Sequence, residues 1–277
     1  MLARVVSAFA VLLAGALVAA LAPAAPDPAP KADELLTVQK GALPIIISAP
    51  HGGRKAIPDV PERVGKGVTN FATVLDNNTA EIAERLAALL EKDLKAKPWF
   101  VIARFTRKHL DVNRPREHAY ESEKAKPHYD AYHAALEDAC KSVKKAYGRG
   151  ILLDIHGQGA HPAAICRGTQ KGQTVSRLID REGWSAVRGK NSVLGRMETL
   201  GYKVLPAGDA PLDTKEEAGF TGGHIVGTYG SHTAFAIDAI QLEFGSHLRA
   251  KEKVEPLAKD LSEAVRAFYD AYLKDGK

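Results

Sequence analysis

Residues 45–53 read IIISAPHGG, an apolar run that ends in a proline, a histidine and two glycines. Isoleucine is branched at its β-carbon and packs well on a pleated surface, so the segment 43–50 is predicted to be a strand buried on both faces. The glycines that follow would let a bulky partner approach the backbone beside His51. A single histidine at a strand end is usually structural, so its meaning depends on what else in the chain converges on it.

Apolar runs of strand length recur along the chain, with helical patterns between them. Further strands are predicted at 98–105, 150–157, 202–207 and 235–244. Apolar residues at a spacing of three to four predict helices at 78–95, 128–147 and 254–273, with a mostly helical stretch at 173–201. Buried strands that alternate with helices predict an α/β fold, a single three-layer domain whose central mixed or parallel sheet is flanked by helices.

The composition fits one domain of ordinary size. The chain has 277 residues, of which 45% are hydrophobic and 26% charged, enough for a sizeable core. Its net charge of +5, from 38 basic and 33 acidic residues, is spread along the chain, and the missing basic block argues against nucleic-acid binding. There is no internal repeat and no second linker, so we expect one domain over 35–277.

The N-terminal segment indicates export. Residues 1–22 have the layout of a secretory signal peptide, with Arg4 ahead of a long apolar run. Cleavage sites fit at Ala20 to Ala22 or at the alanines 24 and 25, and a Pro/Ala-rich linker follows over 23–34. An uncleaved membrane anchor is the alternative, because the run approaches spanning length. We therefore expect a secreted or periplasmic protein, with no stable membrane anchor after cleavage.

Cys140 and Cys166 are the only cysteines in the chain. In an exported protein they could form one disulfide, but their separation in sequence does not establish contact. Two cysteines without a C-x-x-C pattern cannot make a thiolate zinc site. A metal here would therefore need histidine and carboxylate ligands.

Polar residues follow four of the predicted strands. Parallel strands joined by crossover helices place their carboxyl ends at one edge of the sheet, where open α/β sheets bind ligands. His51, His156 and Glu243 end three of these strands. The loop after strand 98–105 adds four more polar residues, Arg107, Asp111, Asn113 and Arg114. The pattern predicts one functional site at this edge.

His51 and His156 suggest a metal centre. Two imidazoles and one carboxylate form a standard catalytic zinc set that leaves one position for water. Asp76, just ahead of the helix predicted at 78–95, is the candidate third ligand, and its alternative role is a helix cap. Asp154 lies on the same side of its strand as His156 and could orient that imidazole, although a buried structural role is an equal alternative.

Glu243 interrupts an apolar strand, QLEFG. Burying a carboxylate costs several kcal/mol unless it is paired or functional. Burial also raises its pKa, which suits a general base near a metal-bound water. A structural salt bridge to an arginine is the alternative.

The stretch TRKHLDVNRPR (106–116) is dense in hydrogen-bond donors. Arg107 and Arg114 could clamp a substrate carboxylate, Asn113 adds an amide donor, and Asp111 can hold one arginine in place. A solvated charged loop is the alternative.

The segment GFTGGHIVGTYG (219–230) is rich in glycine and carries Phe220, His224 and Tyr229. It matches neither a Walker loop nor a Rossmann fingerprint, so it does not support nucleotide binding. We expect a mobile flap or pocket wall with glycine hinges, and His224 and Tyr229 as substrate-binding residues.

Taken in order, SAPHGG, TRKHLDVNR, LLDIHGQG, FTGGHIVGTYG and IQLEFG resemble the motifs of the N-formylglutamate amidohydrolase family, across about residues 40–250. That family is similar in fold to the zinc carboxypeptidases and to the succinylglutamate desuccinylase and aspartoacylase enzymes. The resemblance implies a phosphorylase/hydrolase-like domain with one zinc ion per chain.

The resemblance also implies roles for individual residues. His51 and His156 would be metal ligands, and Glu243 the base that acts on the zinc water. Substrate binding would fall to Asn113 and Arg114, which match the pair that holds the substrate carboxylate. Arg107 matches the preceding motif arginine and is the second catalytic candidate beside Glu243, since Arg107 or Arg114 would polarise the oxyanion or grip the carboxylate.

The sequence departs from the family pattern at three positions. Arg54 stands where carboxypeptidases have the glutamate ligand, which makes Asp76 the family-style replacement. Thr106 stands in place of a common serine, and His224 in place of a common tyrosine.

Together these features predict an exported zinc amidohydrolase that cleaves the amide of an N-acyl (N-formyl) amino acid or a small peptide-like substrate. The alternatives are a zinc peptidase or cell-wall amidase, and a non-catalytic small-molecule binding protein. Formylglutamate hydrolysis belongs to the cytoplasm, so an exported member is expected to meet another substrate. The oligomeric state stays open.

Overall fold

The computed structural model describes residues 34–274. The predicted signal peptide and all but the last residue of the predicted linker lie outside these residues. Within 34–274, no helix combines the length and the apolar character needed to cross a membrane.

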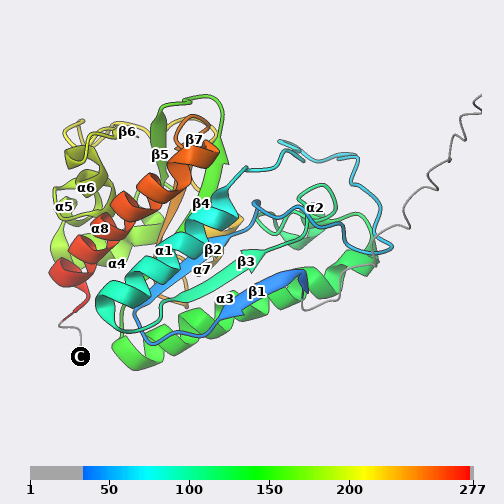
Figure 1. Ribbon diagram of the computed structural model, residues 1–277, viewed down its shortest axis with the longest axis horizontal. Coiled ribbons are helices and arrows are strands. Elements are labelled where there is room, and N and C mark those ends of the chain that lie inside the picture. The colour runs from blue at the N-terminus through cyan, green and yellow to red at the C-terminus, as the bar shows by residue number, and fades with distance from the viewer. Residues whose placement is uncertain (1–33, 275–277) are drawn as a thin grey trace, which may run out of the picture.

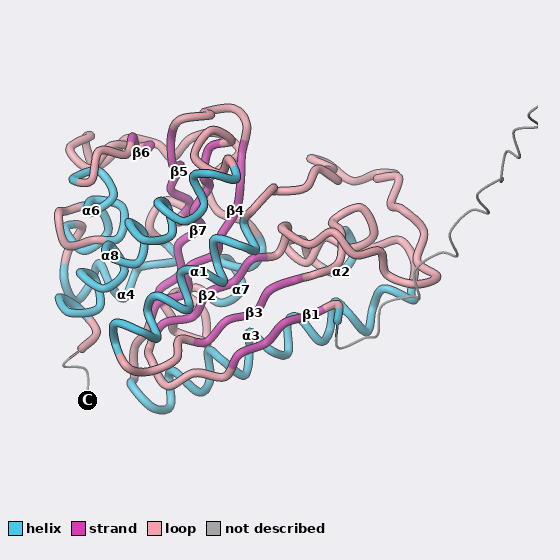
Figure 2. The backbone as a smooth tube through the Cα atoms, viewed as in Figure 1, coloured by secondary structure: helices cyan, strands magenta, loops and turns pink. Residues whose placement is uncertain are grey.

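Seven strands form one mixed sheet in the order β1-β3-β2-β4-β7-β5-β6 (Figures 1 and 2). The strands are β1 Leu36–Gln39, β2 Ile45–Ala49, β3 Trp99–Ala103, β4 Ile151–Gln158, β5 Ala164–Gly168, β6 Lys203–Leu205 and β7 Asp238–Gly245. β3, β2, β4 and β7 run parallel to one another, whereas β1 is antiparallel to β3 and β5 to β7. The four parallel strands therefore end at one edge of the sheet, and they are the strands that the sequence predicts to end in site residues.

Helices cover both faces of this sheet (Figure 1). One face carries α1 Thr79–Leu94, α4 Ser176–Glu182, α5 Ser185–Arg188, α6 Val193–Thr199 and α8 Val254–Tyr272. The other face carries α3 Lys126–Tyr147 and α7 His224–Tyr229, and α2 Arg116–Ala119 lies in the loop after β3. Short 3₁₀ turns at Glu123–Ala125, Gln173–Val175 and Lys251–Lys253 lead into α3, α4 and α8. The predicted three-layer α/β domain is confirmed.

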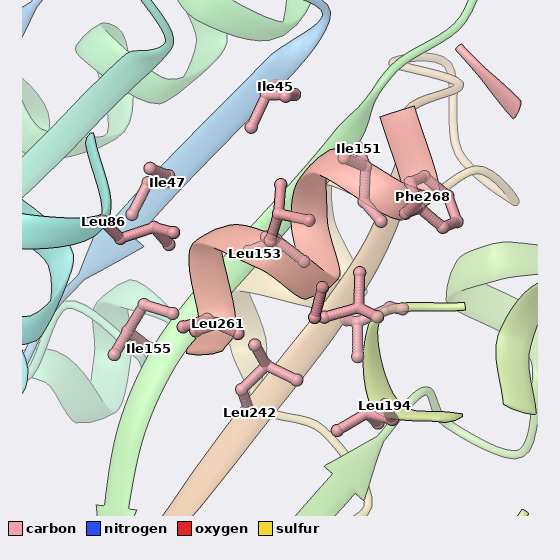
Figure 3. Packing of buried hydrophobic residues seen from close by; sticks show 14 of the residues in the cluster. Ile45, Ile47, Leu86, Ile151, Leu153, Ile155, Leu194, Leu242, Leu261 and Phe268 are labelled. Carbon is pink, nitrogen blue, oxygen red and sulfur yellow. The ribbon is translucent and has the colours of Figure 1, made fainter. Parts of the chain in front are cut away.

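The alternation of side chains along the strands gives the domain two cores. Leu153 of β4 packs with Leu86 of α1 and with Leu261 and Phe268 of α8, all of them buried (Figure 3). Leu152, the next residue back, faces the opposite side and joins the core under α3. Each central strand is apolar on both faces over most of its length, which explains its continuous hydrophobic run.

Several elements differ from the sequence-based expectation. β1 and β5 were not predicted, and the last strand begins at Asp238 rather than at 235, because Ala236 has a positive φ of 57° that breaks the extended backbone. The second half of the glycine-rich segment is helix α7, because Ile225, Val226 and Tyr229 bury one side of it. Cys140 and Cys166 are free, buried thiols.

The glycines after β2 serve packing rather than clearance for a ligand. A β-carbon on Gly52 would lie 2.5 Å from the backbone nitrogen of Ala80, in the first turn of α1. A β-carbon on Gly53 would lie 2.4 Å from the backbone of Arg104. The chain needs these glycines to bring α1 and the end of β3 close to His51.

Candidate functional site

His51 and His156 meet at the carboxyl edge of the sheet. His51 follows the end of β2, and His156 lies in β4, in register with Glu243 of β7. The centroids of the two imidazole rings are 4.8 Å apart, and both residues are buried. Neighbouring parallel strands thus bring together residues that are more than a hundred positions apart in sequence.

Asp76 lies between the two imidazoles. Its Oδ2 is 3.4 Å from Nδ1 of His51 and 3.5 Å from Nδ1 of His156, and it accepts a hydrogen bond of 3.0 Å from the backbone of Gly157. The N-cap position of α1 is Asn78, and no side chain caps that helix. The carboxylate of Asp76 therefore faces the histidines and does not cap the helix.

On the side of each imidazole away from Asp76, a further carboxylate fixes the orientation of the ring. Nε2 of His51 hydrogen-bonds Oδ1 of Asp111 at 2.7 Å, and Nε2 of His156 hydrogen-bonds Oδ2 of Asp154 at 2.8 Å. Asp154 is held in turn by the hydroxyl of Ser48. Because each ring uses Nε2 for its carboxylate, each turns Nδ1 toward Asp76.

The donor set fits a metal ion. One ligand atom from each of His51, Asp76 and His156 lies within 4.8 Å of the others. Nδ1 of His51 is buried and has no hydrogen-bond partner among the described residues, a costly arrangement that a bound cation would relieve. His₂Asp is a nitrogen and oxygen set of the kind found in catalytic zinc sites, so this buried group could hold a metal ion.

The charges around the group also favour a cation. Burial by itself would raise the pKa of Asp76, but the imidazoles of His156 and His51 outweigh it and lower that pKa. Burial would lower the pKa of His156, but Asp154, Asp76 and Glu243 raise it well above its usual value. The carboxylates around His156 thus favour positive charge at this group, and a bound cation would meet the same negative field.

Glu243 lies beside this group with its carboxylate in a buried position. Its Oε1 is 4.0 Å from Nδ1 of His156 and accepts a hydrogen bond of 2.8 Å from the amide of Gln241. Burial raises the pKa of Glu243, with His156 acting against it. Among the described residues its charged partner is His156, so the alternative salt bridge to an arginine does not form.

The loop after β3 brings two arginines to the site. Nε of Arg107 donates to Oδ2 of Asp111 at 2.9 Å, and Nε of Arg114 lies 3.9 Å from the same oxygen. One carboxylate thus binds His51 through one oxygen and attracts both arginines through the other. The predicted role of Asp111 in holding an arginine is only part of what this residue does.

Asn113 is held at the centre of the site. Its Oδ1 accepts a hydrogen bond of 2.9 Å from the backbone of Ile225 in α7, and its Nδ2 donates to Oε1 of Gln241 at 3.4 Å. Gln241 also accepts from the backbone of Gly223 at 2.7 Å. These contacts tie α7 and the glycine-rich segment to β7.

A cavity of about 890 Å³ opens over the group. The predicted ligands His51, Asp76 and His156 line it, together with Glu243 and both arginines. Residues 219–223, including Phe220, form part of its wall, as expected for the first half of the glycine-rich segment.

His224 and Tyr229, predicted to bind substrate, lie elsewhere. Neither is among the described residues that line the cavity. Nε2 of His224 is 3.3 Å from the hydroxyl of Tyr129, and the buried Tyr229 places its hydroxyl 3.0 Å from Nδ1 of His133. Both side chains turn toward α3, because α7 uses them to pack against that helix.

Two features of the site escaped the sequence analysis. Gln241 lies two residues before Glu243 and therefore on the same face of β7, a signal that the sequence does contain. The bond between Asp111 and His51 has no such signal, because it depends on how the loop after β3 folds back over β2.

Solved structures with this fold are known. The crystal structure of N-formylglutamate amidohydrolase from Ralstonia eutropha JMP134 matches 88% of this chain and 100% of its own, with a TM-score of 0.60 and 16% sequence identity. The crystal structure of a gene product from Agrobacterium tumefaciens matches 87% of this chain and 95% of its own, with a TM-score of 0.56 and 13% identity. No protein-family model and no curated protein matches the sequence. At these identities the likeness shows the fold, and the N-formylglutamate amidohydrolase-like fold that the motifs imply is confirmed.

Proposed function

We propose that this protein is a zinc-dependent amidohydrolase that cleaves the amide of an N-acyl amino acid or a small peptide-like substrate. The observation that carries the proposal is the buried group of His51, Asp76 and His156 beside Glu243, in a cavity that also presents arginines. The fold shared with a solved N-formylglutamate amidohydrolase supports the same reaction class.

His51, Asp76 and His156 would hold the ion. Zinc, when bound there, supplies a Lewis acid that polarises a carbonyl and lowers the pKa of water. Asp111 and Asp154 fix the two imidazoles through Nε2 and keep each Nδ1 turned toward Asp76. Their role is to position the ligands.

Glu243 would move the proton. Its raised pKa brings it nearer to the working range of a general base, so it can accept a proton from the attacking water. It can then return that proton to the nitrogen of the leaving amine. Gln241, which donates to Oε1 of Glu243, keeps the carboxylate in place during this transfer.

Arg107 and Arg114 would bind the substrate. Both line the cavity, and a guanidinium forms paired hydrogen bonds with a carboxylate. Asp111 holds Arg107 at the cavity wall, and the backbone oxygens of Asn113 and Asn70 accept from Arg114 at 3.0 and 3.2 Å, so both guanidinium groups are fixed where a substrate carboxylate would meet them. A substrate held in this way is an acylated amino acid or a peptide with a free carboxyl group.

A peptidase or cell-wall amidase is the second candidate, and the size of the cavity favours it. At about 890 Å³ the cavity lies near the upper end of the range of roughly 300–1,000 Å³ found for small-molecule sites. A peptide or a cell-wall fragment would use more of this space than one acylated amino acid.

Export is part of the proposal, and the sequence pattern of residues 1–22 supports it. The mature protein would act outside the cytoplasm. N-terminal sequencing of the protein recovered from the culture medium or periplasm would find a start after Ala22 or Ala25, and an intact N-terminus would contradict this.

A panel assay tests the activity. Purified protein is stripped with a chelator, reloaded with zinc, and incubated with N-formyl, N-acetyl and N-succinyl amino acids, short peptides and peptidoglycan fragments. We expect hydrolysis that chelation removes and zinc restores. Hydrolysis of peptides or peptidoglycan alone would favour the second candidate, and ligand binding without any turnover would indicate a binding protein.

A further inference from the structure

A second cavity lies on the other side of the sheet edge, around Arg167 of β5. In the register of β5 with β7, Arg167 is opposite Leu242 and Cys166 is opposite Glu243. Successive side chains of a strand point to opposite faces, so Arg167 lies on the face away from Glu243. The cavity measures about 280 Å³, and none of its lining residues lines the catalytic cavity.

Arg167 is buried without a hydrogen-bond partner. Its exposed fraction is 5%, and its Nε and Nη1 are buried and make no hydrogen bond among the described residues. Surface arginines satisfy these atoms with water, whereas buried guanidinium nitrogens that make no hydrogen bond destabilise the native state. The folded protein thus holds a buried guanidinium, that of Arg167, whose hydrogen-bond donors are not satisfied by the described residues.

The nearest carboxylate is already engaged. Oε1 of Glu216 is 3.8 Å from Nε of Arg167, beyond hydrogen-bond distance. The same oxygen accepts a hydrogen bond of 2.8 Å from the backbone of Thr169, and Oε2 accepts one of 3.1 Å from the backbone of Lys171. Glu216 therefore ties its loop to the turn after β5 and leaves the guanidinium facing the cavity.

The rest of the cavity is basic on one side and apolar on the other. Its lining contains four basic residues, Arg167, Lys171, Arg188 and Lys215, against two acidic ones, Asp213 and Glu216. Trp184, two prolines and Leu212 supply the apolar part, and Leu212 is 59% exposed. An exposed leucine in the lining of a cavity would be covered by the apolar part of a ligand.

We propose that this cavity binds a small organic anion, whose carboxylate meets Arg167 and whose apolar body packs against Trp184. Arg188 is the second cation for the head group, since one of its nitrogens already donates to the backbone of Ala210 at 2.5 Å and fixes the side chain at the wall. The volume is at the small end of ligand pockets, which limits the ligand to the size of an aromatic or branched carboxylic acid. A phosphate would use the cations but not the apolar wall.

Calorimetric titration and thermal unfolding of the full chain test this proposal, at pH 7.5 and constant ionic strength in chloride. The probes are acetate, 3-phenylpropionate and inorganic phosphate. We expect one molecule of 3-phenylpropionate to bind at least tenfold more tightly than acetate and to raise Tm, as a ligand of the native state must. No saturable binding of a carboxylate, or binding of phosphate alone, would overturn the proposal.

Three variants test where the probe binds. Arg167→Met removes a buried guanidinium that makes no hydrogen bond within residues 34–274 and lies 3.8 Å from its nearest carboxylate, so we expect a Tm equal to or above that of the wild type without ligand and binding at least tenfold weaker. Arg188→Gln leaves Arg167 in place and should weaken binding about fivefold. Arg266→Met is the matched control, because it removes an exposed arginine of α8, and it should bind as the wild type does.

A carboxylate probe could also meet Arg114 in the catalytic cavity. The titration is therefore repeated with Arg114→Gln. Unchanged affinity in this variant assigns the probe to the second cavity. Loss of binding in Arg114→Gln, or wild-type affinity in both Arg167→Met and Arg188→Gln, contradicts the proposal.

Discussion

The two faces of β4 and β7 differ sharply although the same strands form them. On the side of α1 and α8, Leu153 and Leu242 lie in a continuous apolar core (Figure 3). On the side of α3 and α7, His156 and Glu243 lie buried at the carboxyl end. Apolar burial stabilises the first face, while the second face holds charges that burial disfavours. The face toward α1 and α8 thus stays apolar up to the carboxyl end, whereas the face toward α3 and α7 is apolar at Leu152 and carries the proposed catalytic group only at its carboxyl end.

The largest expected effect is on activity, from the polar face. Glu243→Gln keeps the shape and removes the base, so kcat should fall 10²- to 10⁴-fold, about 3 to 5 kcal/mol of barrier. Steady-state kinetics on the best substrate of the panel measures this. Zinc content and Tm serve as the control and should stay at the wild-type level. If the variant keeps more than a tenth of the wild-type activity, Glu243 is not the general base.

On the apolar face the effect should be on stability instead. Leu153→Ala leaves a cavity between β4 and the helices α1 and α8, and we expect the free energy of unfolding to fall by about 2 to 5 kcal/mol. Urea unfolding gives this value. The kcat of the folded fraction should stay near that of the wild type. A loss of kcat as large as that of Glu243→Gln would contradict the separation of stability and activity between the two faces.

In the layer beneath the polar face, the contribution of His133 to the free energy of unfolding should depend on pH. Nε2 of His133 in α3 donates to the backbone oxygen of Val112 at 3.0 Å, and burial lowers the pKa of His133 to about 4. In the unfolded chain this histidine titrates near 6.5, so as pH falls the unfolded state takes the proton first. The contribution of His133 is complete above pH 6.5 and is lost as pH falls through 4, a change of about 2 to 3 kcal/mol.

His133→Gln checks this, because glutamine retains a donor for Val112 but does not titrate. Urea unfolding of both proteins is compared between pH 7 and pH 4. The wild type should lose more stability than the variant over this range. Parallel curves would show that His133 is not held neutral by its surroundings.

The smallest expected effect concerns the residues that position the ligands. Asp154→Asn keeps the size of the side chain but weakens the bond to Nε2 of His156, so zinc affinity should fall about 10- to 100-fold, roughly 1.4 to 2.7 kcal/mol. Competition with a zinc chelator measures the affinity. Asp138→Asn on the exposed side of α3 is the control and should bind zinc as the wild type does.

How much the sequence predicts follows from the same contrast. The central strands were found because both of their faces are apolar over most of their length, and such runs are visible without the structure. β1 and β5 were missed: β1 has four residues at the sheet edge, and β5 carries Arg167 within an apolar pentapeptide. Their strand character depends on neighbours that the sequence does not display.

For the site, the positions of residues on strands are predictable from the sequence, whereas the directions of side chains in loops and short helices are not. His156 and Glu243 belong to strands, so their convergence follows from the parallel arrangement. Asp111 and Tyr229 belong to a loop and a short helix, and the direction of each side chain depends on tertiary packing. Tyr229 therefore lies against His133 rather than in the cavity.

The central claim is that His51, Asp76 and His156 hold one metal ion beside Glu243. The most direct measurement is an anomalous difference map at the zinc edge, from a crystal of the protein reconstituted with zinc. The account predicts one strong peak in contact with Nδ1 of both histidines and with the carboxylate of Asp76. A map without a peak at this group, or with the zinc on other residues, would contradict it.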